Sequence, residues 1–305
     1  MAIKNNDSYF LLLFLPNINE QKSMETTSTN KKRLGKAITD IVVFAFVAMA
    51  VFVFICLFIP FGLIYDKADG VKMPLLIINE VLMLISTFCS IWILCRYRSF
   101  SFGSLGLSMK GRWKDLLWGM LFASALYAVG FGTSLLLGVV EVTEVTFHPT
   151  ALSVTFFFCL LVAVVEEVTM RGFILGRLLN GGVNRFWALL ISSLLFSLLH
   201  LFNPNFTFLP FLNIILAGFL LGTSYVYTRN LAFPISLHLF WNWIQGPILG
   251  YEVSGNILGE SLLLTHLPEA SILNGGAFGF EGSIICTVLI MIGTGVLLLF
   301  YSNHR

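Results

Sequence analysis

The stretch at residues 156–176 reads FFFCLLVAVVEEVTMRGFILG and places two adjacent carboxylates inside an apolar run. Glu166 and Glu167 stand side by side, and Arg171 follows one helical turn later. A charge at the centre of a bilayer costs roughly 2.5–3.5 kcal/mol on insertion scales, so these groups need a partner or a function. On a helix, Glu167 and Arg171 are i,i+4 neighbours that can pair. Glu166 points about 100° away and has no local partner.

The composition of the whole chain indicates that this stretch lies in a membrane. Of the 305 residues, 57% are hydrophobic and only 11% are charged, whereas soluble domains have about 25% charged residues. Apolar runs of about 20 residues recur, and the short alternating segments of a membrane barrel are absent. The sequence therefore predicts an all-α, polytopic membrane protein with about eight transmembrane helices and an intramembrane polar cavity. The expected spans are residues 38–62, 74–95, 115–139, 151–179, 185–202, 208–228, 231–250 and 283–301.

The distribution of basic residues predicts the orientation of the chain in the membrane. If the N-terminus is cytoplasmic, only Lys67 and Lys72 of the 18 Lys and Arg residues fall on the outer side. The outer loops 140–150, 203–207 and 251–282 contain no Lys or Arg at all. The positive-inside rule then places both termini in the cytoplasm. The style of the sequence indicates a prokaryotic cell membrane.

The chain is expected to form one membrane domain preceded by a tail. Residues 1–36 read as a polar cytoplasmic tail and residues 37–305 as a single helical transmembrane domain with a core at about 98–301. The apolar run at 9–16 is too short for a span and lacks a small-residue cleavage site, so it is not expected to be a signal peptide. We expect the segment before Met24 to be dispensable.

Two further pairs of residues stand out against the apolar background. Phe196-x-x-x-His200 comes at the end of the fifth expected span. His238-x-x-x-Asn242 lies in the seventh, and its spacing stacks two polar side chains on one helix face.

The positions of these pairs allow them to meet Glu166. If the fourth helix continues to the turn at 180–184, Glu166 lies 16 residues before Gly182 and His200 lies 18 residues after it. An antiparallel hairpin would bring the two side chains to similar depth. His238 lies nearer the cytoplasmic end of its span, and a tilted helix would present it to the same cavity.

This set of side chains suits hydrolysis of an acyl bond, and a peptide bond in particular. A carboxylate and a histidine, Glu166 and His200, can take a proton from water and deliver it to a leaving amine. His238 and Asn242 can donate hydrogen bonds to an oxyanion. Alternatively, Glu166, His200 and His238 ligate a divalent metal such as zinc, with Asn242 as an auxiliary ligand.

Other hydrolase signatures are absent from the sequence. It contains no HExxH zinc site, no GxGD aspartyl site and no GxSxG nucleophile turn. The five cysteines lie in apolar runs without a CxxC pair, so they read as small apolar fillers. Neither a nucleotide-binding glycine loop nor a basic patch for nucleic acid is present.

The three motifs in this order resemble those of the CPBP family of intramembrane proteases, also called Abi or the CAAX protease and bacteriocin-processing family. The family includes the type II CAAX prenyl endopeptidases. The steps of 34 residues from Glu166 to His200 and 38 residues to His238 suit that pattern, and the resemblance covers about residues 98–301. It implies a multi-span fold whose cavity opens towards the cytoplasmic side. It also implies that Glu166 and His200 activate water while His238 and Asn242 stabilise the oxyanion.

The resemblance also bears on the supporting residues and on cofactors. It implies that Glu167 and Arg171 hold the site in place, and we expect Phe196 to serve in packing. The family is often labelled a metalloendopeptidase, but the metal-free glutamate mechanism explains the same residues and is favoured here, so no cofactor is expected to be required. The expected partners are membrane lipid and a membrane-anchored, prenylated or otherwise hydrophobic peptide.

Less specific interpretations apply to the remaining polar and aromatic residues. Glu80 is a second intramembrane carboxylate and a possible proton or transport site, although its own span holds no basic partner. The loop and tail histidines and the tryptophans of the seventh span are expected to be solvated or to serve as filler: His148, His266, His304, Trp241 and Trp243.

Two functions of other classes stay open. One is a non-proteolytic membrane protein that binds a toxin or partner, as in bacteriocin self-immunity. The other is a small-solute transporter, which inverted repeats would favour; the sequence shows no repeat.

Overall fold

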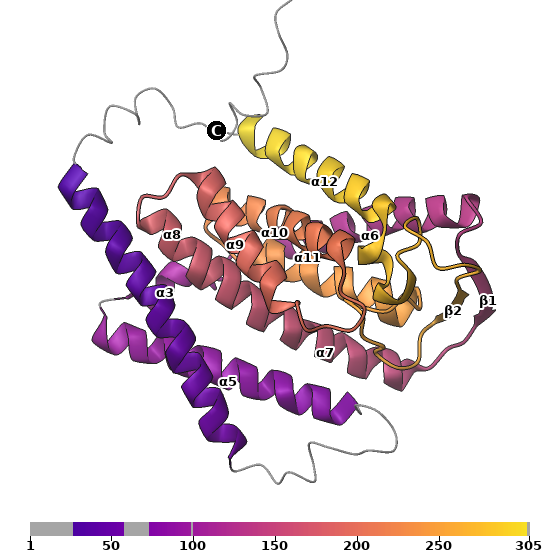
Figure 1. Cartoon of the computed structure of the whole chain (residues 1–305), viewed down its shortest axis with the longest axis horizontal. Helices are drawn as coiled ribbons and strands as arrows, with labels where there is room; N and C mark the ends of the chain where they lie inside the picture. Colours follow the sequence, from indigo (N-terminus) through magenta and orange to yellow (C-terminus); the bar gives the residue numbers. More distant parts are fainter. Residues whose placement is uncertain (1–26, 58–72, 99, 304–305) are drawn as a thin grey trace, which may run out of the picture.

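The computed structural model describes residues 27–57, 73–98 and 100–303. It is a helical bundle with one small sheet at one end (Figure 1). The expectations for the segment before Met24, for Lys67 and Lys72, and for His304 fall outside the described residues. The principal elements are α3 (Thr27–Cys56), α5 (Met73–Tyr97), α6 (Trp113–Leu136), β1 (Glu141–Val145), α7 (Pro149–Glu167), α8 (Gly176–Asn180), α9 (Arg185–Leu199), α10 (Phe208–Thr228), α11 (Ala232–Trp243), β2 (Leu263–His266) and α12 (Ile284–Asn303).

The helices confirm the prediction of an all-α polytopic membrane protein. Within the described residues, six helices are long and apolar enough to cross a membrane. Each of the eight expected spans contains a helix. The fifth and seventh are shorter than expected, because α9 ends at Leu199 and α11 gives way to a π-helix at Ile244–Ile248.

The long fourth helix continues through the polar motif, as the sequence suggested. α7 runs into a π-helical segment at Val168–Leu175 and then into α8, so one helical rod extends from Pro149 to Asn180. A π-helix offsets the regular backbone hydrogen bonds, and such segments occur often at functional sites. Side chains from neighbouring helices compensate: Ser192 donates to the carbonyl of Met170 at 3.0 Å, and Tyr225 donates to that of Gly172 at 3.3 Å.

Two glycines let neighbouring helices approach closely around this rod. A Cβ on Gly119 of α6 would lie 2.8 Å from backbone atoms of Phe233 and Leu237 on α11. A Cβ on Gly218 of α10 would lie 2.6 Å from the side chain of Ser193 on α9. In a membrane the hydrophobic effect does not drive helices together, so they associate through close packing, and small residues at the contacts make that packing possible.

The first two helices lie at the side of this bundle, where α3 crosses α5 (Figure 1). Asp40 of α3 is buried and fixes that arrangement, because Arg98 donates to it at 2.9 Å and Arg177 of α8 pairs with its other oxygen. The sequence did not reveal this anchor. α3 itself begins at Thr27, inside the segment expected to be a tail.

The small sheet was not expected from the sequence. β1 comes from the loop after α6 and pairs antiparallel with β2 from the long loop before α12. The pair lies at the end of the molecule opposite α8 (Figure 1). It ties together two of the loops that lack Lys and Arg, so those loops form one structured end of the bundle.

Candidate active site

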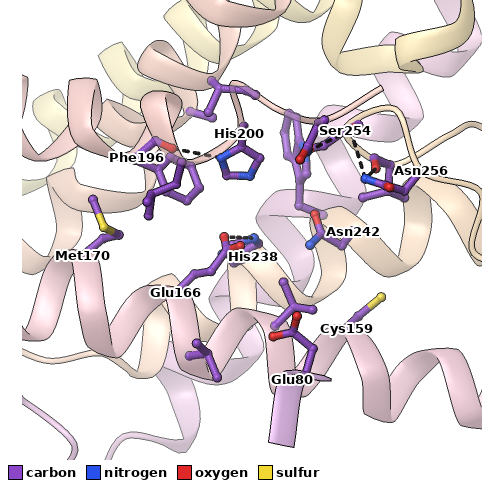
Figure 2. A pocket seen from close by; sticks show the side chains of 18 of the residues that line it. Glu80, Cys159, Glu166, Met170, Phe196, His200, His238, Asn242, Ser254 and Asn256 are labelled. Atoms are coloured by element: carbon purple, nitrogen blue, oxygen red, sulfur yellow. Dashed lines mark hydrogen bonds and ion pairs between the residues drawn. The ribbon is translucent and has the colours of Figure 1, made fainter. Parts of the chain in front are cut away.

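A cavity of about 460 Å³ lies between α5, α7, α9, α10 and α11, beside the loop that precedes α12. The expected catalytic side chains all line it, so the structure brings together the three motifs that lie far apart in sequence. Figure 2 shows them around one space, with Glu80 of α5 across from them. The polar and charged lining residues are Asn79, Glu80, Glu166, Thr169, His200, Asn203, His238, Asn242, Ser254, Asn256 and Glu281.

Glu167 forms the fully buried part of this site. Its carboxylate accepts a hydrogen bond from Arg171 at 2.7 Å, so the predicted i,i+4 pair is present. The same oxygen, Oε1, lies 2.9 Å from Nδ1 of His238. A carboxylate can only accept, so this contact places a proton on Nδ1 and leaves Nε2 directed away from Glu167. Glu167 therefore orients His238 as well as holding Arg171, a link that sequence spacing alone did not indicate.

Arg171 completes this buried set. Its guanidinium carbon lies 4.4 Å from the centre of the Phe196 ring, and its terminal nitrogen lies 3.4 Å from the carbonyl of Gly218. Cation–π contact with an aromatic face stabilises a guanidinium away from water. Phe196 also lies edge-on to both His200 and His238. Phe196 therefore packs between the guanidinium of Arg171 and the two imidazole rings, so it does more than fill space as expected.

Glu166 faces the cavity instead. Its side chain is 26% exposed, and its Oε2 lies 3.6 Å from Nε2 of His238. That oxygen is buried and accepts no hydrogen bond from any described residue. The exposed remainder of the side chain lines the cavity, so a water molecule or a substrate group there can reach it.

His200 and Asn242 contribute the two remaining polar groups. Nδ1 of His200 lies 2.9 Å from the carbonyl of Phe196, which can only accept, so Nδ1 carries a proton and Nε2 is left for the cavity. Asn242 is 8% exposed, lines the cavity, and makes no hydrogen bond to any described residue. Its amide therefore reaches the cavity, where a water molecule or a ligand group can bond to it.

The backbone beyond the third motif repeats a feature of the first. The helix that carries His238 and Asn242 passes directly into the π-helical Ile244–Ile248, which contains Pro247. The first motif thus runs into a π-helical segment, with Arg171 inside it, and the third precedes one. Gln245 in this segment accepts from Tyr127 and donates to the carbonyl of Glu252, so buried side chains stabilise the irregular turn.

Some residues that line the cavity were not predicted from the sequence. Glu281 accepts hydrogen bonds from Trp241 at 3.0 Å and from the backbone and hydroxyl of Ser254 at 2.9 and 2.6 Å. Trp241, expected as filler, is therefore a buried anchor of the loop. Glu281 belongs to the glycine-rich stretch at 274–283. It is the one acidic residue of that stretch, and this was the only feature of the sequence that could have marked it. Glu80 was noticed, but nothing in the sequence placed it beside Glu166.

The described residues do not offer a complete metal site. None of their His, Cys, Asp and Glu side chains form a group of three that could hold a metal ion. The ligand set of Glu166, His200 and His238 considered from the sequence does not come together as such a group in this arrangement of side chains.

The fold and the cavity define a class of protein: a multi-pass integral membrane protein with a carboxylate, histidine and amide site inside the bundle. Residues 148–244 match the family model described as type II CAAX prenyl endopeptidase Rce1-like. This match covers about a third of the chain and agrees with the resemblance of the three motifs to the CAAX (CPBP) family of intramembrane proteases. The match is narrower than the resemblance at 98–301. A comparison with curated proteins gives no match.

Proposed function

We propose that this protein is an intramembrane endopeptidase in which Glu166 activates the water that attacks a peptide bond. The observation that carries the proposal is the contrast between Glu166, whose side chain is partly exposed and lines the cavity, and Glu167, which is fully buried and bonded through Oε1 to Arg171 and His238. A general base must reach the proton it removes, and Glu166 is the carboxylate of this pair that a water in the cavity can reach.

The proposed reaction uses each group in a defined step. Glu166 removes a proton from water as the water oxygen bonds to the carbonyl carbon of the substrate. The resulting oxyanion accepts hydrogen bonds from the side-chain amide of Asn242 and from Nε2 of His238 when that ring is protonated. The carbon–nitrogen bond then breaks, and the proton held by Glu166 passes to the leaving amine.

The two histidines have different supports in this scheme. His238 is held by Glu167, which in turn is held by Arg171, so its ring keeps one orientation through the reaction. His200 presents an unprotonated Nε2 and can assist Glu166 in accepting the proton of water. We propose that the reaction needs no metal, because the carboxylate and imidazole groups supply the proton transfers themselves.

The proposed substrate is a membrane-associated peptide. The cavity is lined by many apolar side chains, among them Met83, Phe158, Leu220 and Leu237, and it lies inside the helical bundle. A hydrophobic or lipid-anchored segment can therefore reach the site without leaving an apolar environment.

Cleavage of a membrane-anchored peptide library by the purified protein in nanodiscs tests this function. Products are identified by mass spectrometry for the unaltered chain and for Glu166→Ala and His200→Ala. The proposal requires cleavage by the unaltered chain and its loss in Glu166→Ala. If no library member is cut, or if Glu166→Ala cuts as well as the unaltered chain, the proposed function fails. A binding or transport role would then be the better explanation of the cavity.

A further inference from the structure

One face of α5 forms part of the cavity wall. The residues of α5 that line the cavity are Leu76, Asn79, Glu80 and Met83. Their spacing of three and four residues places them on one side of the helix. Ile78, which does not line the cavity, is 42% exposed. Because α5 lies before residues 148–244, the family match does not extend to this face.

Glu80 is the only charged residue of this face, and it lies within a candidate membrane span. Figure 2 shows its carboxyl group directed into the same space as Glu166. Its one hydrogen bond among the described residues comes from its neighbour Asn79, at the long distance of 3.4 Å. The charge of Glu166 acts on it across the cavity and repels it, while the imidazole of His238 lies against Glu166 and Glu167 instead. A carboxylate within a membrane needs a partner or a function.

An anchoring role does not account for Glu80. The other half of α5 attaches the helix to its neighbours. Ser86 donates to the carbonyl of Ala48 on α3 at 2.5 Å, and Arg98, just after the helix, donates to Asp40 at 2.9 Å. Among the described residues, Glu80 makes no hydrogen bond to α3 or to α7. Its side chain is therefore available to a group that enters the cavity.

A peptide in this cavity brings polar groups that need partners. Each residue of its backbone has a carbonyl that accepts and an N–H that donates, and either group is costly to bury unbonded. In the proposed reaction, Asn242 and His238 donate to the carbonyl while Glu166 serves the attacking water. A neighbouring N–H still needs an acceptor. An ionised carboxylate can only accept, so Glu80 on the wall formed by α5 is suited to that role.

We propose that Glu80 binds the substrate by accepting a hydrogen bond from a backbone N–H of the peptide beside the cleaved bond. This inference rests on the proposed protease function and adds a substrate-binding residue to the same site from outside the matched segment. α5 then has a defined task in the reaction, because it holds the peptide chain against the catalytic groups of α7, α9 and α11.

The kinetics of two Glu80 variants test this assignment. Glu80→Leu removes the acceptor, whereas Glu80→Gln keeps a carbonyl oxygen but cannot transfer a proton. The contact holds the bound substrate and the transition state alike, so its loss should raise KM and leave kcat nearly unchanged. With the best peptide of the library in nanodiscs, KM should rise about tenfold or more in Glu80→Leu and at most about threefold in Glu80→Gln. Ile78→Ala, at an exposed position outside the cavity, is the control and should leave KM unchanged.

Other results for these variants overturn the inference. An unchanged KM in Glu80→Leu does so, and so does a large loss of kcat in both Glu80 variants, which would make Glu80 a proton-transfer group. The midpoint of thermal unfolding should not fall in Glu80→Leu, because this variant loses a carboxylate that has no charged partner. A marked fall of the midpoint would make Glu80 a structural residue instead.

A substrate series tests the same contact from the side of the peptide, and it does not depend on a variant that folds. The probes are copies of the best peptide, each with one backbone N–H near the cleaved bond replaced by N-methyl. One copy should show a raised KM with the unaltered chain. With Glu80→Leu, that copy and the unmethylated peptide should have the same KM, since both changes remove one hydrogen bond.

Two outcomes of the series overturn the inference: no N-methyl copy changes KM with the unaltered chain, or the effects of methylation and of Glu80→Leu multiply. Cleavage that depends on Glu166 would still support the proposed function in either case. If no peptide is cut, or if cleavage does not depend on Glu166, the proposed function itself has failed.

Discussion

Two adjacent residues of one helix, Glu166 and Glu167, lie in opposite environments. Glu167 has no exposed surface and contacts both Arg171 and His238. Glu166 keeps about a quarter of its side chain exposed and lines the cavity. The rotation of about 100° between successive helical residues is enough to separate them. Glu167 therefore holds the neighbouring side chains of the site in place, whereas Glu166 can contact water or substrate in the cavity.

The largest expected effect comes from removing the free carboxylate. Glu166→Gln keeps the shape of the side chain but cannot accept a proton, so the cleavage rate should fall by about 10²–10⁴-fold, the usual contribution of a general base. The rate is measured on the best peptide of the library in nanodiscs. Near-normal turnover by Glu166→Gln would mean that another group is the base.

The next effect should come from the amide across the cavity. Asn242→Ala removes a donor for the oxyanion, and the rate should fall by about 10²–10³-fold with little change in KM. Asn256→Ala is the matched control, because Asn256 also lines the cavity but bonds only to backbone carbonyls of its own loop. A drop of equal size in both variants would argue against an oxyanion role for Asn242.

Breaking the buried Glu167–Arg171 ion pair should lower the stability of the fold. Arg171→Met leaves the Glu167 carboxylate buried without its cation, and breaking such a pair typically costs about 3–5 kcal/mol. The midpoint of thermal unfolding in detergent should therefore fall markedly. Lys110→Met, an exposed position, is the control and should leave the midpoint unchanged. Equal midpoints for the two variants would show that the pair contributes little.

The smallest expected effect is that of metal removal. If carboxylate and imidazole groups carry the proton transfers, a strong chelator should change the rate by less than about twofold, whereas loss of a catalytic metal removes its Lewis-acid contribution. The rate is followed before and after dialysis against chelator. Loss of activity that added zinc restores would overturn the metal-free mechanism.

Much of this architecture was accessible from the sequence because its signals are local. Apolar runs predicted the helices, and the i,i+4 spacing of Glu167 and Arg171 predicted their ion pair. The continuation of the fourth helix to Asn180 was also expected, since it was needed to bring Glu166 and His200 to the same depth.

The remaining features depend on contacts between distant segments, which periodicity does not encode. The bond from His238 to Glu167 joins residues 71 positions apart. Asp40 binds Arg98 and Arg177 across three helices, and Glu281 reaches the cavity through a loop. The β1–β2 pair is short and β1 is exposed along its whole length, so these residues carry little of the apolar alternation that marks a strand.

The most direct test of the central claim is a paired measurement on Glu166→Gln and Glu167→Gln in the same nanodisc preparation. Cleavage rate and thermal unfolding midpoint are recorded for each variant. Glu166→Gln should lose activity at an unchanged midpoint, whereas Glu167→Gln should lower the midpoint because the buried Arg171 loses the negative charge that pairs with it. A Glu166→Gln protein that cleaves normally, or a Glu167→Gln protein that keeps its midpoint and alone loses activity, would contradict the central claim.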